Sequence, residues 1–156
     1  MRVGIGYDIH PLAEGRRLVI GGVEIESDRG LSGHSDADVL IHALCDALLG
    51  SLNLGDLGDH FPETKEFEGI SSVELLERVA ALVGNEGYYL VNADCIVHAE
   101  APALAPYRKR MAESVATALG VPPERISVKF TRGEGMDAIG RGEGIAARAV
   151  VLLNRG

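Results

Sequence analysis

The 156-residue sequence has no tryptophan, and phenylalanine and tyrosine together make up only 4% of it, so we expect a core of aliphatic side chains. Its two cysteines, Cys45 and Cys95, show neither Cys-x-x-Cys spacing nor the density of a disulfide framework. Reduced, buried thiols in a cytoplasmic protein are therefore expected. No apolar run reaches the length that spans a bilayer. A signal peptide has a basic region followed by an apolar block, and the N-terminal residues do not show this pattern, so we expect none.

Positive charge is also scarce. The 15 lysines and arginines are outnumbered by 23 aspartates and glutamates, which leaves a net charge of -8. This balance argues against broad nucleic-acid binding, which needs a basic surface. An anionic substrate would need local cations that override the overall field. The length and the ordinary hydrophobic content of 46% predict a single domain over residues 1–156.

The opening run, residues 1–10, is apolar and β-prone and ends in Asp8-Ile9-His10. Side chains alternate faces along a strand, so Asp8 and His10 are expected on the same face. A carboxylate and an imidazole together suit zinc or a similar borderline ion. An ion pair at a strand end is the alternative that these two residues leave open. A third ligand must come from elsewhere, and His42 is the best candidate.

A helix is expected from His34–Asp38 to about Leu49, with Ser35 as its N-cap and Gly50 as its stop signal. His42 lies on a different face from the apolar stripe, and one turn away on each side is a carboxylate. Either carboxylate could accept the N–H of the imidazole nitrogen that does not bind a metal. A purely structural histidine is the other interpretation. The stripe consists of Leu40, Ile41, Leu44 and Leu48, and the two carboxylates are Asp38 and Asp46.

The rest of the chain alternates strands and helices. Two short runs at 18–20 and 23–25, joined by Gly21-Gly22, have the pattern of a β-hairpin. A capping box at Ser71–Glu74 predicts a helix to about Val83, and another helix is expected from about Pro106 to Leu119. Strands are expected at 88–99, 126–131 and 145–153, and loops at 11–15, 27–33, 53–69 and 132–144.

These elements predict an α+β fold with a single mixed β-sheet and helices packed on one of its faces. The last expected strand, Ile145–Leu153, is apolar on both sides except at Arg148. Such a strand is typical of a sheet that is buried on both faces. We therefore expect the second face to be buried in an oligomer.

Polar residues without an obvious structural role occur at further places. His34-Ser35 stands at an expected helix start, where free backbone N–H groups favour anions. The 53–69 segment is either a functional loop or a flexible surface loop. In the Gly-rich segment at 132–144, Glu134 could bind a hard cation and Arg141 could bind a phosphate. The glycine spacing is neither that of a dinucleotide fingerprint nor that of a P-loop. The combination points to phosphoryl chemistry.

Taken together, the motifs are similar to those of the 2-C-methyl-D-erythritol 2,4-cyclodiphosphate synthase family over essentially the whole chain. The resemblance implies a metal-dependent, cyclising phosphorus-oxygen lyase. In this family the 2-phosphate of 4-diphosphocytidyl-2-C-methyl-D-erythritol 2-phosphate attacks the β-phosphate and CMP leaves, in the non-mevalonate pathway to isoprenoid precursors. It also implies a homotrimer with active sites between subunits. The motifs are Gly6–His10, Ile20–Val23, Gly33–Asp38, His42–Gly50, Leu54–Gly58, Phe61–Thr64 and Gly140–Ala146.

The resemblance assigns Asp8, His10 and His42 as ligands of Zn2+. It assigns Glu134 to a Mg2+ or Mn2+ ion on the substrate diphosphate. Catalytic roles fall on His34, Arg132 and Glu134. The residues implied for the methylerythritol and phosphate parts are Asp8, Ile9, His10, His34, Ser35, Asp56, Leu57, Gly58, Phe61, Pro62, Glu63, Thr64 and Lys65. Those implied for the cytidine and diphosphate parts are Ala99, Glu100, Ala101, Pro102, Ala103, Leu104, Ala105, Thr131, Arg132, Gly133, Glu134, Ala138 and Arg141.

The chain departs from the family pattern at several of these positions. Arg132 stands where the family has a second threonine that binds phosphate, and an arginine has a different reach. Ala138 replaces a usual phenylalanine, Ala103 a common lysine, and Lys65 an acid. These changes leave two alternatives open: a non-catalytic zinc/diphosphate-binding homologue, and a hydrolase that uses water in place of the 2-phosphate.

One further departure concerns the axis of the expected trimer. Family members often pair an arginine there with a glutamate on the last strand. Arg141 matches the arginine, but Arg148 replaces the glutamate. We therefore expect an unusually cationic axial cavity that favours a diphosphate or another polyanion.

Overall fold

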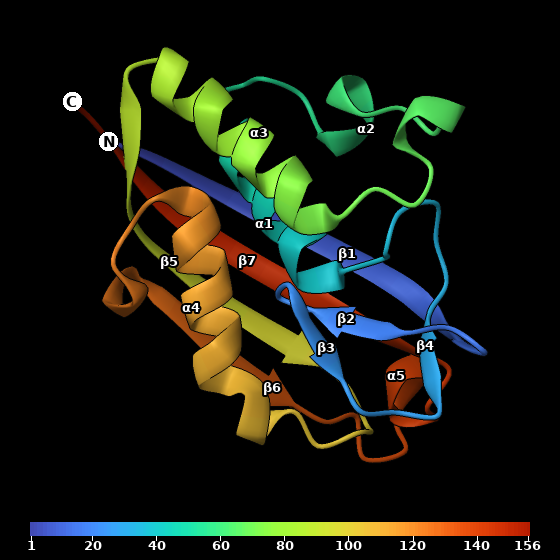
Figure 1. Ribbon diagram of the computed structural model, residues 1–156. Helices are drawn as coiled ribbons and strands as arrows, with labels where there is room; N and C mark the ends of the chain where they lie inside the picture. The colour runs from blue at the N-terminus through green and yellow to red at the C-terminus, as the bar shows by residue number, and fades with distance from the viewer.

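The computed structural model describes residues 1–156. Four strands open the chain, a group of helices follows, and strands and helices then alternate to the C-terminus (Figure 1). The strands are β1 (Arg2–Glu14), β2 (Leu18–Ile20), β3 (Val23–Ile25), β4 (Arg29–Leu31), β5 (Tyr88–His98), β6 (Ile126–Thr131) and β7 (Gly144–Arg155). The α-helices are α1 (Val39–Ser51), α2 (Leu57–His60), α3 (Ser72–Asn85), α4 (Arg108–Leu119) and α5 (Asp137–Gly140). The 3-10 helices are η1 (Lys65–Phe67), η2 (Ala105–Tyr107) and η3 (Pro123–Arg125).

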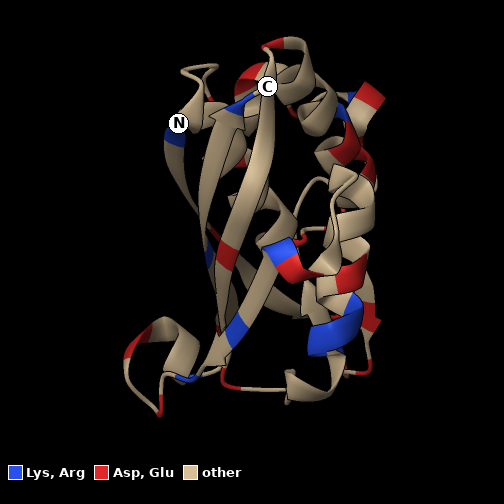
Figure 2. Ribbon diagram, turned by 90° about the vertical axis from the view of Figure 1, so that its left-hand side faces the viewer, with Lys and Arg blue, Asp and Glu red and all other residues tan.

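Five strands form the main sheet in the order β4-β1-β7-β5-β6. The sheet is mixed, because β5 and β6 run parallel whereas the other neighbours are antiparallel. The helices α1, α3 and α4 lie on one side of it (Figure 2). The α+β class, the mixed sheet and the one-sided helices are therefore confirmed. The expectation of a single sheet was wrong, because β2 and β3 form a separate two-stranded sheet.

The core lies between the main sheet and the helices, and it is aliphatic as expected. The stripe predicted for α1 is fully enclosed, and α1 packs directly on β1 and β7. Both cysteines are buried and free. Burial raises the pKa of the Cys95 thiol to about 12 and raises the pKa of Cys45 well above its usual value. Thiols held neutral in this way are poor nucleophiles.

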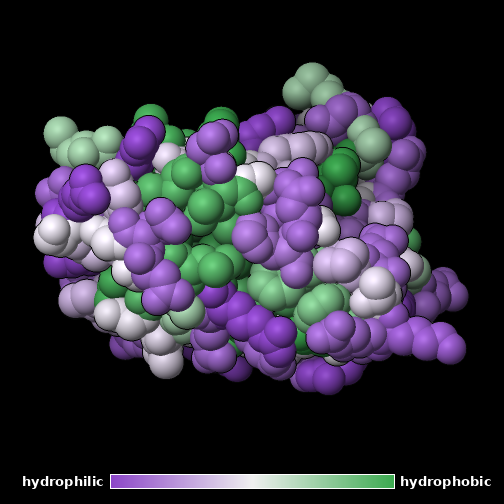
Figure 3. Space-filling model, turned by 90° about the horizontal axis from the view of Figure 1, so that it is seen from above, coloured by the Kyte–Doolittle hydropathy of each residue, from purple (hydrophilic) through white to green (hydrophobic).

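The outer face of the main sheet is different, because large apolar side chains are exposed on it. Ile5 is 71% exposed and Val3 is 69% exposed, and on β7 Val150 is exposed as well as Arg148. The strand predicted to be buried on both faces is buried on both faces only over Gly144–Ala147, and from Arg148 onward its outward-facing residues are exposed or half-buried in the single chain. Hydrophobic surface also gathers in the middle of the face seen from above, with hydrophilic side chains around it (Figure 3).

The first strand is longer than predicted. Residues 12–14, expected in a loop, pair with the three residues of β4, which also lay in an expected loop. β4 reads Arg-Gly-Leu and, unlike the hairpin strands, has neither an apolar run nor an adjoining turn signal, so only its pairing with β1 reveals it. The 53–69 segment contains α2 and η1, and the 132–144 segment contains α5. The last main helix, α4, begins at Arg108 after the 3-10 turn η2 and ends at Leu119, with Gly120 as its C-cap at a φ of 65°.

Two helix caps also differ from prediction. The N-cap of α1 is Asp38, whose carboxylate accepts the backbone N–H of Ile41 at 3.1 Å, while the Ser35 hydroxyl accepts from Ala37. Ser71 makes no side-chain cap on α3. The Asp36 carboxylate accepts the N–H of Ser72 instead, so a residue from another part of the chain takes the place of the expected capping box. No helix in the structure combines the length and the hydrophobicity needed to cross a membrane.

Candidate active site

Two glycines bring α1 against β1. A β-carbon at Gly4 would lie 1.9 Å from the backbone oxygen of Ala47, and one at Gly6 would lie 1.8 Å from that of Ala43. Only glycine therefore allows this helix to approach the strand so closely. The next two inward-facing positions of β1 carry Asp8 and His10, so the same approach puts them beside the first turns of α1.

Three polar side chains meet at this contact. One Asp8 carboxylate oxygen, Oδ2, lies 3.0 Å from His10 Nε2 and 3.1 Å from His42 Nδ1. The two imidazole rings are 5.6 Å apart between centroids, in an edge-on arrangement. One donor atom from each residue lies within 4.8 Å of the others. The predicted convergence of these three residues is confirmed.

The electrostatics of the cluster favour a charged carboxylate. Burial alone would raise the pKa of Asp8, but hydrogen bonds with His10 and His42 outweigh it, and the pKa lies below its usual value. The hydrogen bond with Asp8 raises the pKa of His10, against the effect of burial. An ionised carboxylate between two imidazoles is a donor set that suits zinc and similar ions. The residues present therefore fit the predicted metal.

Neither carboxylate predicted to orient His42 makes a hydrogen bond to it. Asp38 accepts the backbone N–H groups of Gly21 and Gly22 at 2.9 and 2.7 Å, so it joins the hairpin to the start of α1. Burial raises the pKa of Asp38 to about 6, and these backbone donors act in the opposite direction. Asp46 accepts the N–H of Leu57 at 2.8 Å and so positions α2.

The metal cluster opens into a pocket of about 200 Å³. Of the residues predicted to bind substrate, it gathers Asp8, His10, His34, Ser35, Leu57, Gly58, Phe61 and Glu63. Ile9, Asp56, Pro62, Thr64 and Lys65 do not line it. Phe67, Ile70 and Leu75, which sequence reasoning missed, complete its apolar wall.

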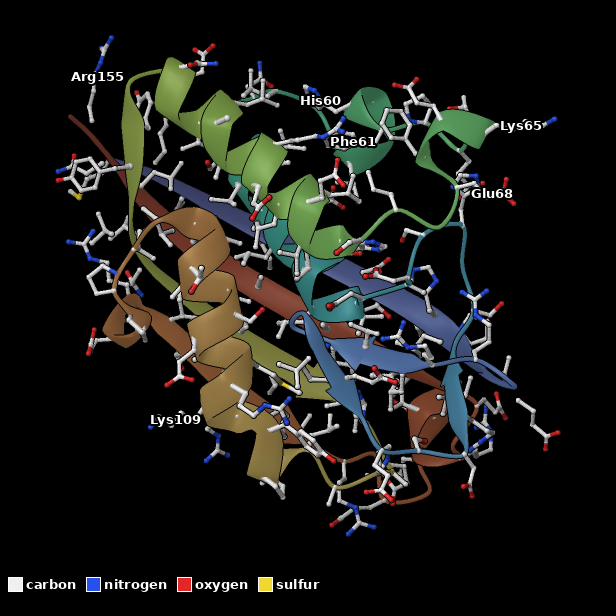
Figure 4. All side chains as sticks on the ribbon, in the orientation of Figure 1. His60, Phe61, Lys65, Glu68, Lys109 and Arg155 are labelled. Carbon is white, nitrogen blue, oxygen red and sulfur yellow. The ribbon has the colours of Figure 1, made fainter.

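The segment that covers this pocket is built around α2. Asp56 and Asp59 form a reciprocal capping box at its start, so the Asp56 side chain has a structural partner. Phe61 packs edge-on against Phe67 with a centroid distance of 5.5 Å. The Lys65 side chain extends away from the molecule (Figure 4). The predicted loop is thus ordered, and its inner side is aromatic.

A second, larger pocket of about 720 Å³ lies where β5 and β6 end. It gathers the predicted residues Ala99, Glu100, Pro102, Ala103, Leu104, Ala105, Thr131, Arg132 and Glu134. Ala101, Gly133, Ala138 and Arg141 do not line it. Arg141 is instead paired with Glu143 at 2.7 Å. The pocket also includes Arg108 and Phe130, which were not predicted.

Glu100 organises the wall of this second pocket. Its carboxylate forms an ion pair with Arg132 at 2.6 Å and accepts the backbone N–H groups of Gly133 and Glu134. The hydrogen bond with Arg132 keeps the pKa of Glu100 below its usual value. Arg132 is thus already paired, whereas the Arg108 guanidinium lies over the Phe130 ring at 5.2 Å.

Comparison with known proteins agrees with this geometry. The YgbB family model matches residues 1–154. A 2-C-methyl-D-erythritol 2,4-cyclodiphosphate synthase of Desulfosudis oleivorans is 52% identical over 154 residues, covering 98% of this chain and 92% of the relative. One of Thiobacillus denitrificans is 55% identical, covering 100% and 98%. A solved structure of this synthase in a CDP-bound form is 38% identical with a TM-score of 0.90, covering 98% and 100%. The chain therefore belongs to the YgbB family, the family of the 2-C-methyl-D-erythritol 2,4-cyclodiphosphate synthases.

Proposed function

We propose that this protein is a 2-C-methyl-D-erythritol 2,4-cyclodiphosphate synthase. It converts 4-diphosphocytidyl-2-C-methyl-D-erythritol 2-phosphate into the cyclic diphosphate and CMP. The observation that carries the proposal is the convergence of Asp8, His10 and His42 on one point beside a pocket. Relatives that carry this name match the chain over nearly their whole length. Metal identity is part of the proposal: zinc at this cluster, and magnesium or manganese on the diphosphate near Glu134.

The two pockets bind different parts of the substrate. The small pocket at the cluster takes the methylerythritol part, and its polar residues His34 and Ser35 face the phosphate. The zinc ion, when bound, supplies positive charge that polarises the β-phosphate. The attacking oxygen belongs to the substrate, so the site has no need to activate a water molecule. Charge neutralisation and positioning are the main tasks left to the protein.

The larger pocket takes the cytidine diphosphate part. Its volume suits a nucleotide, and a related synthase has been solved in a CDP-bound form. Ala103 and Ala105, which are exposed and line this pocket, present their backbone groups to the base. Arg108 supplies a cation to this pocket in addition to the Arg132–Glu100 pair.

We further propose a homotrimer in which each active site joins the small pocket of one subunit to the large pocket of its neighbour. Two observations support this assembly. The two pockets share no lining residue, and the outer sheet face exposes apolar side chains such as Ile5, Val3 and Val150. An exposed apolar face of this kind is typical of an interface. One domain over residues 1–156 and a cytoplasmic location remain predictions.

The cationic axial cavity also remains a prediction. Arg148 lies over the Tyr7 ring at 4.8 Å on the outer face, whereas the Glu143 carboxylate offsets the charge of Arg141. We expect native mass spectrometry of the trimer at low salt to show a bound polyanion. A trimer of unmodified mass would contradict this prediction.

The reaction is tested by incubating the protein with the cytidine-diphosphate substrate, zinc and magnesium. The expected products are CMP and a cyclic diphosphate, distinguished from a linear diphosphate by 31P NMR. CMP with a linear product would identify a hydrolase instead. If no CMP were released, the enzyme assignment would be wrong and the non-catalytic binding homologue would remain.

A further inference from the structure

Ser72 lies between His42 of the metal cluster and the carboxylate of Asp36, a residue with no role in the proposed mechanism. It is the first residue of α3 and is completely buried. Its hydroxyl lies 2.9 Å from His42 Nε2 and also forms a hydrogen bond with the Asp36 carboxylate. Its backbone N–H donates to the second oxygen of that carboxylate at 3.0 Å. Asp36 therefore holds Ser72 with both of its oxygens.

The direction of these hydrogen bonds is fixed by the number of protons available. An ionised carboxylate only accepts, and a serine hydroxyl has a single hydrogen to donate. Because that hydrogen goes to Asp36, the Ser72 oxygen can only accept from His42. The contact of 2.9 Å therefore requires a hydrogen on His42 Nε2. With Nε2 donating to Ser72, Nδ1 is the nitrogen that faces Asp8, 3.1 Å from its Oδ2. A cation bound there would take the place of the proton in this hydrogen bond and use the Nδ1 lone pair.

The other contacts of the two rings are compatible with this direction. The Ser35 hydroxyl lies 3.1 Å from the same Nε2; it accepts the Ala37 N–H and has a second lone pair that can accept from Nε2. His10 has the same arrangement with its two nitrogens exchanged: Nδ1 donates to the Ser32 carbonyl at 3.0 Å, and Nε2 faces Asp8 Oδ2 at 3.0 Å. Each ring thus uses one nitrogen for a contact outside the cluster and turns the other toward Asp8, where a cation would bind.

We propose that Asp36 and Ser72 are positioning residues that hold His42 in the Nε2–H tautomer, so that its Nδ1 is ready to bind the metal. The inference rests on the metal site of the proposed function and adds residues to it. Hydrogen-bonded partners of this kind orient ligand imidazoles, and their loss typically costs about 10- to 100-fold in metal affinity.

The first test measures zinc affinity in the absence of substrate. Metal-free full-length protein competes for zinc with a chromophoric chelator, and Ser72→Ala should bind zinc about 10- to 100-fold more weakly. Ser51→Ala is the matched control, because Ser51 is also buried but its hydroxyl donates to the Leu48 carbonyl at 2.7 Å. It should bind zinc within about twofold of wild type. Equal affinities for the wild-type and Ser72→Ala proteins would overturn the proposal.

The second test reads the tautomer directly. Long-range 1H–15N NMR of the metal-free protein at alkaline pH should show His42 protonated at Nε2, and Ser72→Ala should shift the ring toward the Nδ1–H form. Asp36→Asn gives an independent variant, because its amide would donate to Ser72 and reverse the hydrogen bond to His42. An Nδ1–H wild-type ring, or an unchanged tautomer in both variants, would contradict the proposal. Neither test uses the reaction, so missing CMP release with normal zinc affinity would overturn the proposed function alone.

Discussion

Gly6 and Ala43 face each other so closely that the backbone of β1 touches the backbone of α1. A β-carbon at position 6 would lie 1.8 Å from the Ala43 carbonyl oxygen and 2.8 Å from its carbonyl carbon. The neighbour is backbone rather than a side chain that can turn away, so any substitution must move the helix. Since His42 precedes Ala43, the distance between helix and strand also sets the geometry of the metal cluster.

We predict that Gly6→Ala separates α1 from β1. The unfolding free energy should fall by about 2–4 kcal/mol, as for other overpacked core positions, and zinc affinity should fall at least tenfold. Gly50→Ala is the matched control, because a β-carbon at this exposed position of α1 would have no other atom within 4 Å. It should raise stability by about 0.5–1 kcal/mol. Urea denaturation and zinc competition measure both effects; unchanged affinity in Gly6→Ala would refute the link.

The ligand set gives a second prediction. His42→Ala should abolish stoichiometric zinc, because Asp8 and His10 alone leave two protein ligands where a catalytic zinc site normally has three. His98→Ala, on the opposite face of the sheet from the cluster, should keep full occupancy. Metal analysis after gel filtration provides the measurement. Zinc retained at one per chain in His42→Ala would remove this residue from the ligand set.

Arg108 is predicted to bind the anionic part of the nucleotide. Arg108→Ala should weaken CDP binding about tenfold, equivalent to about 1.4 kcal/mol, as measured by isothermal titration calorimetry. Arg110→Ala is a natural control: that guanidinium lies over Tyr107 at 5.9 Å and does not line the large pocket. Equal losses in the two variants would point to general electrostatic attraction rather than to a contact in the pocket.

The carboxylate of Asp38 is predicted to hold the hairpin on α1. Asp38→Ala leaves the N–H groups of Gly21, Gly22 and Ile41 without their acceptor. At pH 7 this should cost about 3 kcal/mol of unfolding free energy, whereas Asp28→Ala, at an exposed position, should cost under about 0.5 kcal/mol. A loss as small as that of the control would show that the hairpin is held by other contacts.

The raised pKa of Asp38, about 6, adds a pH dependence. A folded-state pKa above the unfolded value means that the folded protein binds the proton more tightly. The contribution of Asp38 to stability is therefore greatest in acid and falls as pH rises from about 4 to about 6. The difference in unfolding free energy between wild type and Asp38→Ala should shrink over this range, by at most about 1.4 kcal/mol per pH unit. A difference that grows with pH would contradict the raised pKa.

The exposed apolar face gives the prediction about assembly. Ile5→Glu, on the outer face of β1 where Ile5 is 71% exposed, should convert trimers to monomers in sedimentation velocity experiments. Ala81→Glu, exposed on α3, should remain trimeric. Because the proposed active site joins two subunits, the Ile5→Glu monomer should also lose CMP release. A monomeric wild-type protein would refute the proposed assembly.

Much of the site could be predicted from sequence because its signals are local. Asp8 and His10 share a face through strand alternation alone, and the pattern of α1 is short-range. The hairpin turn at Gly21-Gly22 was likewise predictable, because both glycines take positive φ values of 61° and 72°, which other residues rarely adopt.

What could not be predicted depends on contacts between distant segments. Asp36 and Ser72 are 36 positions apart. No local sequence signal indicates that the Asp36 carboxylate accepts the backbone N–H of Ser72 at the start of α3. Ser35 was a reasonable N-cap by residue type, but Ala37 takes a φ of 56° and the helix starts later, at Val39, with Asp38 as its N-cap. Arg108 was not predicted at the site, because its place over Phe130 depends on how α4 meets β6.

The cluster joins residues that lie 34 positions apart in the chain, on the two elements that the Gly6 contact presses together. A cation bound there would cross-link β1 to α1 and would bind the folded state in preference to the unfolded chain. Its binding free energy would then add to folding stability by mass action, about 2.7 kcal/mol at a free zinc concentration 100 times the dissociation constant. The melting temperature of the protein would therefore report the zinc concentration of its surroundings, and chelation would make the same fold easier to unfold.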